Sequence, residues 1–241
     1  MIDWLRRAPD EDPLVCIGGR ELPLAVRRHS RARRLTMRLA PDGSAIRITL
    51  PLWGRAEDAL VFARARLEWL ERQLAAVPQA SRPLPGGTIF YRGRELTIDW
   101  HASHPRKPTH SAGAVRIGGP RESLAARLQR WLESEAQRLL EDDLAFYCDR
   151  SGHSPPPLRL SRAQRRWGSC SDRKAIRVNW RLVQAPDFVR RSVVAHEVAH
   201  MTHFDHSPAF HALLAKLFEG ELRSADTWLK AHGRTLYSSF G

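Results

Sequence analysis

The sequence predicts an α+β protein with strands mostly in its N-terminal half and helices mostly in its C-terminal half. Apolar and polar residues alternate in Leu35–Leu39 and in Ile46–Leu50, with a Pro-Asp-Gly turn sequence at 41–43, which is typical of two strands joined by a turn. From residue 120 onward, helical spacing of apolar residues dominates. The chain has no internal repeat, so these two patterns describe its organisation.

The N-terminal half also contains one long helical pattern. Apolar residues recur every three or four positions from Ala56 to Val77, which predicts a single helix. The proline- and glycine-rich stretch 78–87 interrupts this pattern. Short strands are expected to resume at Ile89–Tyr91 and Leu96–Trp100.

The C-terminal half is expected to be mostly helical, with one strand. The helices are expected at Pro120–Cys148, Pro186–His203, Pro208–Phe218 and Ser224–His232, and the strand at Ala175–Leu182.

Two domains follow from this distribution of elements. Histidine, proline, serine and glycine are frequent in 101–119, which indicates a loop. We expect a strand-rich N-terminal subdomain with one long helix at residues 1–105, a linker at 106–119, and a second domain at 120–241 that carries the chemistry.

Composition excludes several classes of protein. Apolar residues make up 42% of the 241 residues, enough for a packed core, and no run of about 18 apolar residues predicts a membrane span. Residues 1–13 lack the apolar stretch of a signal peptide. Three dispersed cysteines without a CxxC pair are typical of a reducing compartment and argue against a disulfide framework or a cysteine-built zinc site. We expect a cytoplasmic protein; the sequence gives no indication of its oligomeric state.

The net charge of +13 comes almost entirely from arginine, since lysine occurs at only four positions. Guanidinium groups match phosphate and carboxylate geometry, so nucleic acids, nucleotides and acidic proteins are all candidate partners. The alternative interpretation is a compositional bias that places arginine on solvated surfaces. The basic residues are spread along the chain, and both interpretations stay open at this point.

The segment 193–200, VVAHEVAH, predicts a metal centre. On a helix, His196 and His200 lie one turn apart on the same face and can bind one ion. Glu197 is turned roughly 100° from His196, so it is placed to activate a metal-bound water rather than to join the ligands. The alternative interpretation is a pair of solvent-facing histidines that have this spacing by chance. The surrounding valines and alanines argue against it, because burying these polar groups would be costly without a cation. Zinc is the expected ion.

Several residues are candidates for the third ligand. His203 lies about 4.5 Å further along the helix axis than His200, out of reach unless the helix ends early. His206 is preferred, because Ser207-Pro208 predicts an N-cap and a first-turn proline at which the chain turns back. His211, one turn inside the next helix, and a later glutamate, Glu219 or Glu221, are the alternatives.

These residues belong to a larger set of segments that resembles a known family. The segments are RWGSCS at 166–171, IRVNWRL at 176–182 and VAHEVAH at 194–200, followed by DHSPAF at 205–210. Together they resemble the YgjP-like metallopeptidase family, relatives of the SprT-like and WLM zinc proteases. Weaker matches at 31–39 and 93–96 extend the resemblance to about residues 20–237. One departure is His211, where relatives usually carry tryptophan.

The resemblance implies a fold and a ligand set. It implies a zincin-like core, in which a short sheet packs beside the two-histidine helix, and it implies that His206 completes the zinc site. An edge strand would run alongside the metal, where an extended peptide could add as a further strand. We expect Ala175–Leu182 to be this edge strand, with Asn179 and Trp180 in ordinary strand packing. Arg166 is either a solvated side chain or a group that stabilises an oxyanion or holds a phosphate.

The resulting functional prediction is a zinc-dependent peptidase in which Glu197 is the general base. One alternative is a metal-dependent nucleoside triphosphate pyrophosphohydrolase, acting for example on UTP, which the resemblance also implies and the arginine excess would suit. Another is a DNA-associated, SprT-like protease, or a nucleic-acid-binding module with a structural zinc. The sequence does not choose the substrate.

Overall fold

The computed structural model describes residues 12–77 and 82–240, and the chain divides into two compact units, residues 1–79 and 80–241. Most of the segment 1–13 and part of the stretch 78–87 therefore lie outside the described residues. Both units combine helices with strands, which confirms the α+β class. Within the described ranges, none of the helices combines the length and the apolar character that crossing a membrane requires.

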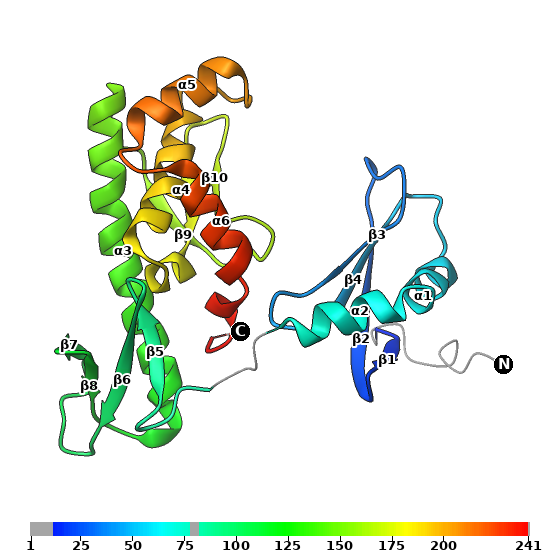
Figure 1. Cartoon of the computed structure of the whole chain (residues 1–241), viewed down its shortest axis with the longest axis horizontal. Coiled ribbons are helices and arrows are strands. Elements are labelled where there is room, and N and C mark those ends of the chain that lie inside the picture. Colours follow the sequence, from blue (N-terminus) through cyan, green and yellow to red (C-terminus); the bar gives the residue numbers. More distant parts are fainter. Residues whose placement is uncertain (1–11, 78–81, 241) are drawn as a thin grey trace. The chain divides into compact units, whose positions relative to one another are not determined.

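The first unit contains a four-stranded sheet with the strand order β1-β2-β4-β3 (Figure 1). β2 runs parallel to β4, and the other two neighbouring pairs are antiparallel. The two strands expected from alternation are confirmed as β3 and β4, since their apolar residues face one buried side. The four strands are β1 (Leu14–Ile17), β2 (Arg20–Arg28), β3 (Thr36–Leu39) and β4 (Ile46–Leu50).

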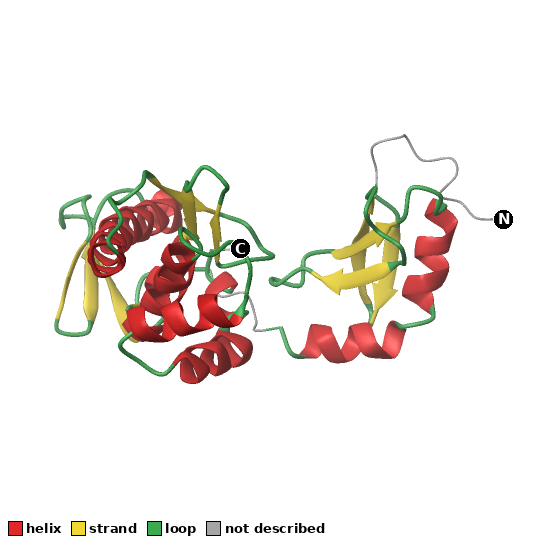
Figure 2. Ribbon diagram, turned by 90° about the horizontal axis from the view of Figure 1, so that it is seen from above, coloured by secondary structure: helices red, strands yellow, loops and turns green. Residues whose placement is uncertain are grey.

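Two helices, not the single expected one, cover one face of this sheet. α1 (Ala56–Arg64) and α2 (Leu67–Ala75) are separated at Arg66, whose φ of −130° and ψ of 25° are not helical. The chain turns there, and the two helices run at a large angle to one another (Figure 2). The prediction of one helix was wrong because helical spacing continues across the break, whereas only a bent path brings the buried residues of both helices, such as Leu60 and Leu70, into one core.

The second unit begins with another four-stranded sheet, in the order β5-β6-β8-β7. Two of its strands lie in the segment expected to be a loop, so that expectation was wrong. Val115 and Ile117 are fully buried, and β8 pairs parallel with β6. The apolar pattern between the flanking glycines is too short to predict this strand. The strands are β5 (Thr88–Tyr91), β6 (Arg94–Trp100), β7 (Thr109–Ser111) and β8 (Ala114–Ile117).

The boundary between the units follows from this sheet. It lies after residue 79 rather than near residue 105, because β5 and β6 share their core with the helices of the second unit. The segment 106–119, expected to be a linker, contributes β7 and β8 to the same unit.

A long helix, α3 (Leu124–Ser151), spans the second unit (Figure 1). Buried residues recur along it from Leu124 to Cys148, and they join the four-stranded sheet and the C-terminal helices in one core. The other expected helices are also present, with shifted ends. They are α4 (Asp187–Ala199), α5 (Pro208–Leu217) and α6 (Leu222–His232). Short 3-10 helices also occur at Arg121–Ser123 and Thr235–Tyr237.

A three-stranded sheet of order β10-β11-β9 packs beside α4. Its strands are β9 (Leu158–Ser161), β10 (Gly168–Cys170) and β11 (Ile176–Asn179). The segment expected as the edge strand is β11, which is central, so the expectation was wrong and β10 is the edge strand beside α4. The strand also ends earlier than expected. The Asn179 Oδ1 accepts the N–H of Arg181 at 3.1 Å and caps a 3-10 helix at Trp180–Gln184.

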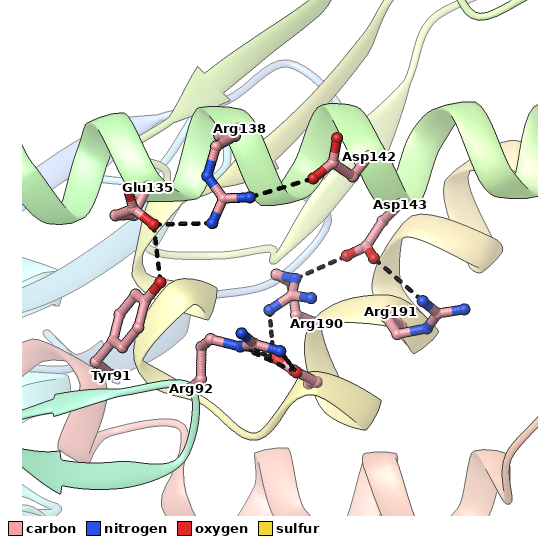
Figure 3. A network of polar contacts seen from close by, with 9 residues as sticks. Tyr91, Arg92, Glu135, Arg138, Asp142, Asp143, Arg190 and Arg191 are labelled. Atoms are coloured by element: carbon pink, nitrogen blue, oxygen red, sulfur yellow. Dashed lines mark hydrogen bonds and ion pairs between the residues drawn. The ribbon is translucent and has the colours of Figure 1, made fainter. Parts of the chain in front are cut away.

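Helix α4 is fixed against α3 by a buried ion pair (Figure 3). The Arg190 Nε donates to the Asp143 Oδ2 at 2.7 Å, and the two side chains are only 3% and 4% exposed. Arg190 also bonds Asp187 in the first turn of α4, and Asp187 pairs with Arg92. Arg191 pairs with the same Asp143 at 3.5 Å. Charges in such a buried site hold their partners in one geometry, since any unpaired charge there would be costly.

We predict that Asp143→Ala lowers the free energy of unfolding by about 3 kcal/mol, because it leaves the buried Arg190 with fewer carboxylate partners. Urea unfolding of the full chain measures the effect. Asp142→Ala is the matched control, since Asp142 is 68% exposed and pairs only with the exposed Arg138 among the described residues. Its cost should stay below about 1 kcal/mol. Equal effects of the two substitutions would contradict the anchoring role of Asp143.

Candidate metal centre

Three imidazoles converge at the C-terminal end of α4. The His196 Nε2 lies 3.1 Å from the His200 Nε2 and 3.3 Å from the His206 Nε2. One ligand atom from each of the three residues lies within 4.8 Å of the others. The three residues predicted as ligands therefore present their nitrogens to one point, two from successive turns of α4 and one from the segment after it.

The spacing of these nitrogens and the lowered pKa of His196 fit a small divalent ion. Ligand bonds of about 2.0–2.1 Å at tetrahedral angles place two imidazole nitrogens roughly 3.3 Å apart. The pKa of His196 is lowered to about 4, first by burial and then by the neighbouring histidines His200, His206 and His211. A neutral imidazole is the form that binds a metal. The donor set is therefore suited to zinc.

Because α4 ends early, His203 contributes its backbone carbonyl to the site and not the imidazole ligand considered from the sequence. The last helical residue is Ala199, and His200 is the C-cap. The chain then turns, and the His203 carbonyl lies 3.0 Å from the His200 Nδ1. An Nδ1–H donated to this carbonyl fixes the tautomer in which the His200 Nε2 offers its lone pair. The His203 side chain is not among the three converging ligands.

The placement of His206 depends on the start of α5. Ser207 is the N-cap, its hydroxyl accepts the Phe210 N–H at 3.4 Å, and Pro208 occupies the first turn. The Asp205 carboxylate accepts the Ser207 N–H at 3.4 Å. These bonds confirm the turn predicted from Ser207-Pro208. They direct the chain back so that His206 lies beside His196 and His200.

Phe210 supports all three imidazoles. Its fully buried ring lies 4.5 Å from the His200 ring, 4.9 Å from the His206 ring and 5.0 Å from the His196 ring, measured between centroids. A rigid aromatic ring behind the ligands limits their rotation. The sequence did not reveal this role of Phe210, although its position three residues after the N-cap, on the buried side of α5, was compatible with it.

The remaining candidate ligands are engaged elsewhere. Glu219 accepts the Tyr147 hydroxyl at 2.8 Å and pairs with Arg191, and Glu221 accepts the Ser224 hydroxyl at 2.6 Å. The His211 ring lies 6.4 Å from that of His206, between centroids, and lines the adjacent cleft. None of these three residues belongs to the cluster of converging ligand atoms among the described residues.

Glu197 lies next to the imidazoles in an apolar setting. It is 5% exposed, and burial raises the pKa of its carboxyl to about 7, while Arg166 and the Cys170 N–H oppose this rise. A carboxyl with such a pKa can accept and release a proton near neutral pH.

Gly168 leaves the space that Glu197 fills. A Cβ at position 168 would lie 2.3 Å from the Glu197 Oε1 and 2.7 Å from its Cδ. Position 168 lies in strand β10, and only glycine there leaves room for the carboxylate. The sequence alone did not connect Gly168 with Glu197.

A cleft of about 530 Å³ opens beside Glu197 and His196. One wall is apolar and comes from α4, α5 and α6, through Val193, Leu214, Leu222 and Leu229. Residues 166–168 also line the cleft, and the side chain of Arg166 among them is exposed. Asn179 and Trp180 are fully buried and lie outside the lining, consistent with a packing role.

We predict that His206→Ala weakens zinc binding by at least about a hundredfold, since loss of even an outer partner of a ligand costs 10–100-fold in affinity. Competition with a chromophoric chelator measures this. His203→Ala is the matched control, because its backbone carbonyl, which faces His200, remains in place. An affinity that falls equally in both variants would remove His206 from the ligand set.

Comparisons with known proteins place these residues in a family. The sequence matches the profile of the YgjP-like metallopeptidase domain over residues 33–232. Among solved structures, the chain is similar to the metallopeptidase zymogen abylysin of Pyrococcus abyssi, with 19% identity over 39% of this chain and 92% of that one and a TM-score of 0.33. No curated protein sequence matches. Since the profile spans most of the chain, the protein belongs to the YgjP-like metallopeptidase family.

Proposed function

We propose that the protein is a zinc-dependent peptidase in which His196, His200 and His206 hold the ion and Glu197 is the general base. The observation that carries this proposal is the position of one buried carboxylate beside three converging imidazole nitrogens, at the wall of an open cleft. Structural zinc sites normally close with four protein ligands, whereas three ligands and a free carboxylate are typical of hydrolytic sites.

A zinc ion held by the three histidines would supply Lewis acidity toward the substrate carbonyl and the attacking water. In the proposed reaction, the Glu197 carboxylate takes a proton from the attacking water and then delivers it to the leaving amine. The Cys170 N–H, which bonds this carboxylate, orients it while leaving the other lone pairs for the proton transfer. The apolar surroundings of Glu197 exclude competing water.

Strand β10 offers a place for an extended substrate. The Trp167 carbonyl accepts the Asn179 N–H at 2.7 Å, and the Ser171 N–H donates to the Ala175 carbonyl at 3.0 Å, so odd-numbered residues bond the central strand. The backbone groups of Gly168 and Cys170 then point away from β11 by the alternation of an antiparallel pair, and on that side the Cys170 N–H bonds Glu197. The Gly168 N–H and carbonyl and the Cys170 carbonyl are the groups that a substrate strand would use. A peptide that pairs with this edge would pass the cleft residues Arg166–Gly168 with its scissile bond near Glu197.

The lining of the cleft favours a peptide over a nucleoside triphosphate. Four aliphatic side chains form one wall, which suits an apolar side chain of the substrate. Arg166 is the one lysine or arginine among the lining residues, and Asp226 adds a carboxylate. A triphosphate would require several cationic partners at this place.

Replacing Glu197 tests the mechanism. We expect Glu197→Gln to bind zinc as the wild type does and to lose turnover by at least about a hundredfold, because the amide cannot accept the proton. The measurement screens both proteins against a peptide library and a panel of nucleoside triphosphates, with a chelator control. Pyrophosphate release without peptide cleavage, or full activity of the variant, would overturn the proposal.

Replacing Gly168 tests the placement of the carboxylate. The methyl group of Gly168→Ala would force Glu197 from its position, so we expect turnover to fall by about tenfold or more while zinc affinity stays unchanged. Ser169→Ala is the control on the same strand, because the backbone of Ser169 bonds the central strand β11, whereas Gly168 lies against Glu197. Unchanged activity of Gly168→Ala would show that Glu197 need not occupy this position.

A further inference from the structure

Within the first unit, the described residues cover only one face of the sheet with helices. α1 and α2 pack on the face formed by Leu22, Leu24, Ile46, Ile48 and Leu50. Because side chains alternate along a strand, the neighbouring residues point to the opposite face. On β2, β3 and β4 these neighbours include Arg27, Arg38 and Arg47, all of which are exposed.

The arginines on this open face are close enough to repel one another. Arg38 and Arg47 are direct partners in the antiparallel pair β3 and β4, which places their Cβ atoms about 4.5–5.5 Å apart. Arg27 lies one row further, opposite Thr49. Like charges in this arrangement destabilise a sheet unless an anion lies between them. Among the described residues, none of these three arginines forms an ion pair with a carboxylate. Glu21, an acidic residue on the same face, lies at the opposite end of β2 from Arg27.

The topology adds further arginines at one end of the face. β2 and β4 are parallel, so their C-terminal ends lie at the same end of the sheet, where the antiparallel strand β3 begins. The connection from β2 to β3, residues 29–35, therefore passes this end of the sheet and carries the exposed Arg31, Arg33 and Arg34. His29 ties it to β4 through its N–H, which donates to the Leu50 carbonyl at 2.9 Å. We call Arg27, Arg31, Arg33, Arg34, Arg38 and Arg47 the arginine face.

An exposed tryptophan lies at the same end of the sheet. Trp53 follows β4 within three residues and is 74% exposed, although burying an aromatic ring of this size is ordinarily favourable. The Arg28 Nε donates to the Gly54 carbonyl at 3.1 Å, which holds the loop of Trp53 against the end of β2. The sheet end thus presents guanidinium groups together with a free aromatic surface.

We propose that the arginine face and Trp53 bind single-stranded nucleic acid. Arginines neutralise phosphates along the strand, and an unpaired base stacks on Trp53; basic grooves with aromatic platforms bind single strands in this way. An acidic protein would match the charge, but it gives no reason for the exposed tryptophan beside the arginines. The proposal concerns the first unit alone and is independent of the peptidase assignment.

The test measures binding of the full-length protein to a fluorescein-labelled oligothymidine by anisotropy over a range of salt concentrations. We expect Arg38→Gln/Arg47→Gln to weaken binding by about tenfold at low salt and to reduce the slope of log K against log salt by about 1.4, or 0.7 for each lost phosphate contact. We expect Trp53→Ala to weaken binding by about fivefold or more. The double variant should unfold at the same or a higher temperature than the wild type, since it removes a like-charge pair.

Arg64→Gln/Arg72→Gln is the matched control, with the same charge change on the two helices that cover the other side of the sheet. Weaker binding in the arginine-face variant but not in this control supports the proposal. Equal losses in both double variants, or wild-type affinity in Trp53→Ala, would overturn it. Binding of poly-glutamate as tight as that of the oligonucleotide would indicate an acidic protein as partner and would overturn it as well.

Discussion

The buried ion pair between Arg190 and Asp143 fixes the helix on which the candidate metal centre is built. Three imidazoles can meet at one point only if the backbone that carries them is held to within a fraction of an ångström. Arg190 lies six residues before His196 on α4, and its carboxylate partner comes from α3, the longest helix of the second unit. The ionic contact is a geometric constraint more than a source of stability, because desolvation offsets much of its attraction.

The second constraint is the termination of α4 at Ala199, with His200 as its C-cap. A longer helix would carry His203 further along the axis and move His206 away from the ligand point. Because the chain turns at this place, the His203 carbonyl is free to orient His200, and the capped start of α5 brings back both His206 and Phe210. One turn of the backbone thus supplies the candidate ligand His206, the carbonyl that contacts His200 and the aromatic ring beside all three imidazoles.

The two units present different chemistry. The second unit combines three converging imidazoles, the buried carboxylate of Glu197 and an aliphatic cleft wall, which suits the proposed hydrolysis of a peptide with an apolar side chain. The first unit has arginines on an open sheet face and an exposed tryptophan, which suits an extended polyanion. Part of the arginine excess that is spread along the sequence therefore lies together on the arginine face, while other exposed arginines are distributed over both units. Sequence spacing could not separate this outcome from a general bias in composition.

The sequence by itself determined what depends on local spacing. His196 and His200 share a helix face, Ser207-Pro208 begins the next helix, and alternation marked β3 and β4, because each of these properties involves only a few neighbouring residues. Tertiary structure decided the rest. The break at Arg66, the pairing of β8 with β6, the pairing of β11 with β9 and the contact of Gly168 with Glu197 all depend on residues outside the local segment. Pairing and packing set these features, and no local pattern records which distant residue will fill a given space.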